Sequence, residues 1–224
     1  MEAKPRKVAF IHASPAAIDP LARFYREAAP ELETTNLLDD GLLRFFALRR
    51  WDDAEQRLAE MIAAARAAHD CELAMLTCSA VPRGIVENLR PQADFPILRI
   101  DDALARRAVQ TGGRIGLVVS FPPTLETTRE LLNQTALELG VSIEILPELV
   151  PEAYHALLAG ESQRHDELVV NAVARLDRQG AGAIVLAQVS MGCVLPQLKD
   201  RIGAPVLSSL HTSLDAIRAT LGEL

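Results

Sequence analysis

The chain has 224 residues, with 23 basic and 30 acidic side chains and a formal net charge of −7. This acidic balance excludes the electrostatic attraction on which nucleic-acid binding and adsorption to an anionic membrane depend. Hydrophobic residues make up 49 % of the chain and aromatic residues only 4 %. A core of small aliphatic side chains is typical of helices packed on a parallel sheet, so we expect one large α/β domain or two small lobes.

The amino-terminal part of the chain predicts alternating strands and helices, from its apolar runs and helical periodicity. The expected strands are 8–11, 33–38, 73–76 and 96–100, and the expected helices are 19–28, 42–68 with a break near 51–53, 82–90 and 103–110. Pro20 and Pro82 are expected at first helical positions, where the missing N–H is not needed.

The second half repeats this order, with expected strands at 115–119, 142–146, 183–188 and 205–208 and helices at 125–139, 153–177 and 212–221. Matched elements are displaced by 107, 110 and 109 residues, from 8 to 115, 78 to 188 and 96 to 205. We therefore predict an internal duplication into two pseudo-symmetric, Rossmann-like or flavodoxin-like α/β lobes with parallel sheets.

The expected lobes are residues 1–100 plus 210–224 and residues 101–209. Open parallel sheets bind ligands beyond the carboxyl ends of their strands. We therefore expect these ends of both lobes to face a shared active-site cleft.

The cysteines bear on compartment and chemistry. Cys71, Cys78 and Cys193 match no zinc-ligand spacing and no disulfide framework, and such a sparse, odd count is typical of a reducing compartment. The apolar stretch 8–11 is too short for a signal-peptide core, and no apolar run has the length of a membrane span. We therefore expect a cytoplasmic protein without a bound metal or a membrane partner.

The candidate site centres on residues 75–82, where a buried strand delivers Cys78 to a strand-to-helix turn. A thiol at a helix start lies among free backbone N–H groups at the positive end of the helix dipole. Both effects stabilise a thiolate and lower the cysteine pKa. The alternative is a buried structural cysteine, the commonest role of a free cysteine.

The second half offers two partners for this thiol. Counted from the strand end, the partner of Cys78 is Gln188, which cannot serve as an acid or base. Counted back from the helix proline, Cys193 precedes Pro196 by three positions, against four from Cys78 to Pro82. We favour Gln188 because sheet pairing fixes strand ends while loops vary, and Cys193 remains the alternative.

The two halves, together with the segments Leu-Thr-Cys-Ser-Ala at 76–80 and Gly-Cys-Val-Leu-Pro at 192–196, resemble the aspartate/glutamate/hydantoin racemase superfamily. The resemblance covers essentially the whole chain. It implies a cofactor-independent racemase or isomerase that acts next to the carboxylate of a small amino acid or dicarboxylate. Dimers are common for such folds, although nothing in the sequence forces a homodimer.

The resemblance also implies roles for individual residues. Cys78 is the expected base or nucleophile, with Cys193 as the alternative second thiol. Ser14, Ser79 and Thr124 are the expected substrate-binding hydroxyl residues. Gln188, Ser190 and His12 are added to this set, His12 because it ends a strand that faces the expected cleft. The alternative for His12 is a core histidine bonded to the backbone. Gln188 in place of a second cysteine favours one-sided chemistry. The alternatives are therefore a one-cysteine decarboxylase or double-bond isomerase of the superfamily, or a non-catalytic protein that binds small carboxylates.

Other signals are set aside. The glycine-rich stretch 111–116 precedes a strand instead of following one, so it lacks the geometry of a phosphate-binding loop. The acidic pairs 39–40 and 101–102 are expected to cap turns or helices instead of binding metal. His211 has a weak claim to ligand contact, and we expect His69, His155 and His165 at the surface.

Overall fold

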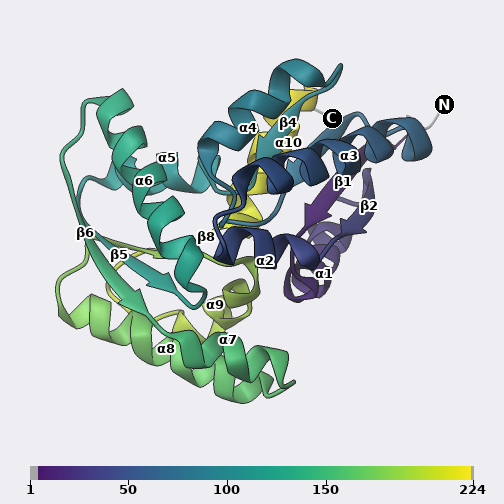
Figure 1. The fold of residues 1–224 in the computed structure, drawn as a ribbon. Coiled ribbons are helices and arrows are strands. Elements are labelled where there is room, and N and C mark those ends of the chain that lie inside the picture. Colours follow the sequence, from purple (N-terminus) through teal and green to yellow (C-terminus); the bar gives the residue numbers. More distant parts are fainter. Residues whose placement is uncertain (1–4, 223–224) are drawn as a thin grey trace. The chain divides into compact units, whose positions relative to one another are not determined.

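In residues 5–222, which the computed structural model describes, the chain forms two parallel four-stranded sheets flanked by helices (Figure 1). The first sheet has the order β2-β1-β3-β4 and contains β1 (Arg6–His12), β2 (Leu32–Leu38), β3 (Leu73–Leu76) and β4 (Ile97–Arg99). The second has the order β6-β5-β7-β8 and contains β5 (Gly113–Val119), β6 (Ile143–Leu149), β7 (Ala183–Leu186) and β8 (Val206–Ser208). The predicted α/β fold with duplicated parallel sheets is confirmed.

Helices connect successive strands in both sheets. Those of the first half are α1 (Ile18–Ala28), α2 (Gly41–Ala47), α3 (Trp51–His69), α4 (Arg83–Leu89) and α5 (Asp102–Thr111). Those of the second half are α6 (Pro122–Leu139), α7 (Pro151–Leu158), α8 (Ser162–Arg178), α9 (Leu195–Leu198) and α10 (Ser209–Leu221). Short 3₁₀ segments η1 (Pro15–Ala17), η2 (Arg90–Gln92) and η3 (Val189–Val194) complete the connections. None of the helices within 5–222 is long and apolar enough to span a membrane.

The chain divides into two compact units, Met1–Ile100 with Ser213–Leu224 and Asp101–Thr212. α10 is joined to α1 by a buried hydrogen bond of 2.8 Å between the hydroxyls of Tyr25 and Ser213. Burial raises the pKa of Tyr25, so this hydroxyl keeps its proton at neutral pH. The first unit therefore contains segments from both ends of the sequence.

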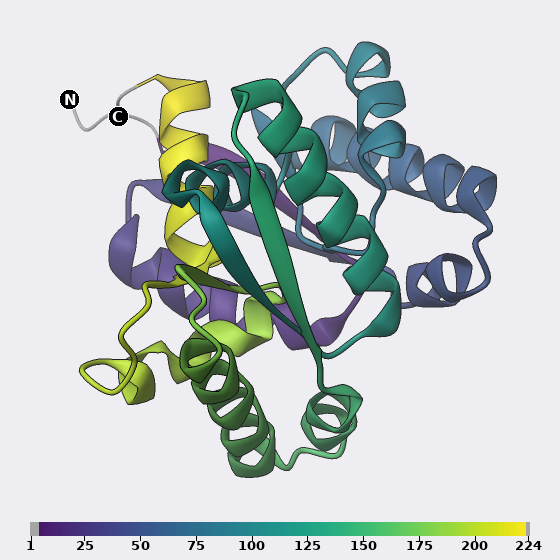
Figure 2. The same cartoon turned by 90° about the vertical axis from the view of Figure 1, so that its left-hand side faces the viewer.

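The second unit has helices on both faces of its sheet (Figures 1 and 2). Successive strand residues point to opposite faces. Val118 of β5 accordingly packs in one apolar cluster with α7, α8, η3 and α9. Its neighbours Leu117 and Val119 pack in another with α5 and α6. Burial on both faces explains the continuous apolar runs in the central strands of this sheet.

Two helix starts differ from the expectation. Ser14 caps η1, which runs directly into α1, so Pro20 is the third residue of α1 and not the first. Pro82 is extended, with ψ 146°, and α4 begins only at Arg83. A turn closed by the hydrogen bond from Val81 N to Cys78 O separates β3 from α4.

Gly116 lies where α8 packs closely on β5. A Cβ at this position would be 3.0 Å from Cδ1 and 3.2 Å from Cβ of Leu176, a fully buried residue of α8. Gly116→Ala should therefore lower the free energy of unfolding by about 1–3 kcal/mol through overpacking. Urea unfolding monitored by circular dichroism measures the change.

Gly84 in α4 is the matched control, because a Cβ there meets no atom within 4 Å. Gly84→Ala should leave the unfolding free energy unchanged or raise it by up to about 1 kcal/mol, as expected for alanine in a helix. Equal effects of the two substitutions would contradict a close contact between α8 and β5.

Candidate functional site

Cys78 lies directly beyond the carboxyl end of β3. It is partly exposed, whereas its neighbours Thr77 and Ser79 are buried. The turn that follows belongs to no helix, and α4 starts five residues after Cys78. The delivery of Cys78 by a buried strand onto a strand-to-helix turn is confirmed, whereas its expected place at the helix start is wrong by five residues.

The segment before Cys78 is held by a buried histidine. His12 Nε2 lies 2.9 Å from Oδ1 of Asn36, and His12 Nδ1 lies 2.8 Å from Oγ1 of Thr77. Burial lowers the pKa of His12, and the hydrogen bond to Asn36 offsets part of this change. The amide oxygen can only accept, so the neutral ring carries its proton on Nε2. His12 Nδ1 and the Ile11 carbonyl, 3.1 Å from Thr77 Oγ1, are then both acceptors for the single proton of the Thr77 hydroxyl. These contacts favour a positioning role for His12.

A buried arginine supports the segment after Cys78. Arg99, at the end of β4, is 2 % exposed, and its Nη2 donates to the carbonyl of Ser79 at 3.4 Å. Its Nε has no hydrogen-bond partner among the described residues. Neither Arg99 nor Asn36 could be found from sequence spacing, because Arg99 contacts Ser79 across the pairing of β3 with β4 and Asn36 is linked to Thr77 only through His12 of β1.

Gln188 follows β7 and contacts the end of β5. Its Oε1 accepts from Ser120 N at 3.2 Å. A backbone N–H can only donate, so this contact fixes the orientation of the amide. The Nε2 group is buried and has no partner within the described part of the chain. Gln188 therefore holds two amide N–H donors whose hydrogen-bonding capacity is unused within the described residues.

Sheet register makes Cys78 and Gln188 equivalent. In the first unit, Thr77 N donates to a carbonyl of β1 at 3.0 Å, and in the second, Ala187 N donates to the matching carbonyl of β5 at 3.0 Å. Each donor is the first residue after its strand. The residues that follow, Cys78 and Gln188, therefore occupy the same position in their own sheets.

Cys193 and Ser190 lie farther along, in η3. Cys193 is exposed, and its Sγ lies 3.0 Å from the Ser190 carbonyl and 3.2 Å from Oδ1 of Asp166 in α8. The Cys193 thiol thus contacts the helix that covers one face of the sheet.

The remaining expected hydroxyl residues follow the first strand of each unit. Ser14 is partly exposed, and its Oγ accepts from Ala16 N at 3.3 Å as the cap of η1. Thr124 is buried in the first turn of α6. Their loops thus correspond in the two units, while their local conformations differ.

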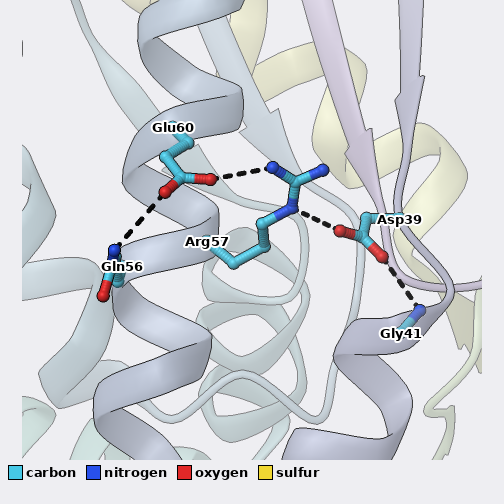
Figure 3. A network of polar contacts seen from close by, with 5 residues as sticks. All are labelled: Asp39, Gly41, Gln56, Arg57 and Glu60. Carbon is cyan, nitrogen blue, oxygen red and sulfur yellow. Dashed lines mark hydrogen bonds and ion pairs between the residues drawn. The ribbon is translucent and has the colours of Figure 1, made fainter.

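The residues set aside are explained by local structure. Asp39 accepts from Gly41 N at 2.9 Å and pairs with Arg57, which also donates to Glu60 (Figure 3). This carboxylate therefore caps the start of α2. His69, His155 and His211 are exposed, but His165 is buried at 1 % exposure, so its expected surface position is wrong. Its face of α8 packs against η3.

Comparison with solved structures identifies the same architecture elsewhere. Glutamate racemase from Bacillus anthracis matches with a TM-score of 0.77 and 14 % identity, over 99 % of this chain and 85 % of that chain. Allantoin racemase from Klebsiella pneumoniae matches with a TM-score of 0.70 and 21 % identity, over 96 % and 87 %. Aspartate racemase from Picrophilus torridus matches with a TM-score of 0.71 and 13 % identity, over 96 % and 93 %. At these identities the likeness establishes the fold.

Sequence comparison gives the family. No curated protein sequence matches the chain. The family described as Asp/Glu/Hydantoin racemase matches residues 21–217. This range includes every strand of both sheets except β1, and it includes Cys78 and Gln188. The resemblance inferred from residues 76–80 and 192–196 is thereby confirmed, and the chain belongs to the Asp/Glu/hydantoin racemase family.

Proposed function

We propose that the chain is a cofactor-independent isomerase that acts at the carbon next to the carboxylate of a small amino acid or dicarboxylate. Cys78 is its base or nucleophile. The observation that carries this proposal is the partly exposed thiol at the carboxyl end of β3, between buried Thr77 and Ser79. Family membership and the racemase fold support the reaction class.

In the proposed reaction the Cys78 thiolate takes the proton from the α-carbon. The electron pair left on carbon is delocalised into the substrate carboxylate, which becomes an enediolate. An N–H donor aimed at this oxygen stabilises the developing charge more than it stabilises the ground state. The unpartnered Nε2 of Gln188 is the proposed donor, since its Oε1 is already bonded to Ser120 N.

Hydrogen bonds before and after Cys78 hold its backbone in place, as a base or nucleophile requires. The His12–Thr77 hydrogen bond fixes the backbone entering Cys78, and Arg99 holds the carbonyl of Ser79. A neutral His12 with both ring nitrogens bonded is proposed to act through Thr77, outside the proton-transfer steps. The positive charge of Arg99 beside Ser79 is proposed to favour an anionic substrate.

Gln188 also favours a second candidate within the same superfamily. A single thiol, on one face of the substrate, is sufficient for decarboxylation with protonation from that face, or for one-directional double-bond isomerisation. Racemisation needs proton delivery to both faces, and an amide cannot supply a proton at neutral pH. A non-catalytic carboxylate-binding protein is the remaining alternative, because such a protein needs the N–H donors but no reactive thiol.

Alkylation separates the enzyme from the binding protein. Peptide-resolved mass spectrometry after iodoacetamide treatment at neutral pH should find fast labelling of Cys78 that a bound small dicarboxylate suppresses. Cys71 is fully buried, and burial raises the pKa of its thiol, so it should stay unlabelled in the folded protein. Exposed Cys193 reports on general accessibility, and its labelling should not respond to the acid. Slow labelling of Cys78 favours the binding protein.

Exchange of the α-hydrogen with solvent deuterium tests the catalytic role. With glutamate or aspartate as substrate, which homologous racemases are named for, Cys78→Ala should lower the exchange rate by about 10²–10⁴-fold, as expected for loss of a general base. Proton NMR of the substrate in D₂O measures the rate. If Cys193→Ala retains exchange, the result supports Gln188 as the counterpart of Cys78 in the second half of the chain. Loss of exchange in both variants would instead assign Cys193 to the reaction.

Substitution of Gln188 tests one-sided chemistry. Gln188→Ala should slow exchange by about 10²–10³-fold through loss of an oxyanion donor. Gln188→Cys adds a thiol at the position equivalent to Cys78, and should raise the ratio of stereochemical inversion to exchange. Chiral chromatography and NMR of the same samples give both rates. An inversion ratio in Gln188→Cys equal to that of the unaltered protein would contradict the proposed equivalence.

A further inference from the structure

Three side chains with metal-ligating atoms meet where α8 packs against η3. His165 Nδ1 lies 2.8 Å from Asp166 Oδ1, and Cys193 Sγ lies 3.2 Å from the same oxygen. One ligand atom from each of the three residues lies within 4.8 Å of the others. We propose that this group, the α8–η3 cluster, binds a divalent zinc ion.

The donor atoms select the metal. A thiol sulfur, an imidazole nitrogen and a carboxylate oxygen are the ligands of Zn²⁺, whereas Ca²⁺ and Mg²⁺ prefer oxygen alone. Tetrahedral bonds of about 2.0–2.3 Å to zinc place neighbouring ligand atoms roughly 3.3–3.6 Å apart. The observed separations of 2.8 and 3.2 Å are close to this range. For these two pairs, ligation needs the atoms to move apart by about half an ångström or less, and the histidine nitrogen and the thiol sulfur already lie within 4.8 Å of each other.

Neighbouring groups already orient the ligands. Gln197 Nε2 donates to Asp166 Oδ2 at 3.2 Å, which leaves Oδ1 directed at the histidine and the thiol. His165 is 1 % exposed, so packing holds its ring, and its Nε2 is buried without a partner among the described residues. A hydrogen bond from outside the ligand set that fixes a ligating carboxylate is typical of metal sites.

The cluster is open on one side. The Asp166 side chain is 22 % exposed and Cys193 is exposed, whereas His165 is buried. A metal ion can therefore enter past the thiol, and a water molecule can complete three protein ligands. On binding, the Cys193 thiol loses its proton to solvent and coordinates as thiolate. The ion would tie η3 to α8, and this link involves neither Cys78 nor Gln188.

Cobalt provides a probe of the thiolate ligand. We expect the purified chain, first treated with chelator, to bind one Co²⁺ and to develop a thiolate-to-cobalt charge-transfer band in the near ultraviolet. Added Zn²⁺ should displace Co²⁺ and remove the band. Cys193→Ser should abolish the band, and competition with a chromophoric chelator should find Zn²⁺ affinity reduced by at least about 100-fold. The exposed position of Cys193 makes this substitution compatible with folding, which circular dichroism checks.

Two further variants sharpen the test. Gln197→Ala removes a group that orients Asp166 and should weaken Zn²⁺ binding by about 10–100-fold while the cobalt band remains. Cys78→Ala removes the other solvent-accessible thiol and should leave both the band and the affinity unchanged. Absence of the band in the unaltered chain, its persistence in Cys193→Ser, or its loss in Cys78→Ala would each overturn the proposal.

Discussion

Parallel pairing at the carboxyl ends of the central strands is the constraint on which the candidate site depends. The hydrogen bonds from Thr77 N to β1 and from Ala187 N to β5 fix where each chain segment leaves its sheet. A shift of one residue would turn every side chain beyond the strand to the opposite face. The register therefore decides which side chains emerge at the sheet edges, and it selects Cys78 in one unit and Gln188 in the other.

The two units keep this register but surround it with different polar groups. In the first, His12 and Arg99 at the ends of β1 and β4 brace the segments on either side of Cys78. Pairing within the second sheet places Val119 and Ser208 at the matching strand ends. Buried polar contacts are retained only where their hydrogen bonds are largely satisfied. The first unit thus has buried polar contacts on both sides of Cys78, while the second unit has a neutral amide, that of Gln188, at the equivalent position.

Much of the fold could be predicted from the sequence because its signals are local. Apolar runs identify the buried strands, and the near-constant displacement between the halves identifies the duplication. The delivery of Cys78 by a buried strand follows from the same local signal. Helix starts were less accurate, because the extended Pro82 and the turn before it compete with helix formation over a few residues.

The unpredicted part of the site consists of contacts between residues far apart in sequence. Arg99 contacts Ser79 from the neighbouring strand β4, and Asn36 of β2 is linked to Thr77 only through His12, so no spacing rule connects either residue with Cys78. His165 lies on a helix rich in charged residues, which indicates a solvated face. Its burial depends on η3, a segment that the sequence did not distinguish from an ordinary loop.

The six residues of η3 also explain why two ways of counting gave different partners for Cys78. In the first unit, a short turn and Pro82 connect the strand to α4, whereas η3 intervenes between Gln188 and α9 in the second. Counting from Pro196 therefore includes residues without a counterpart in the first unit. The added segment carries Cys193 from the strand end to α8, where its neighbours are a carboxylate and an imidazole. A thiol in those surroundings has the ligand chemistry of a metal site, while the position equivalent to Cys78 belongs to Gln188.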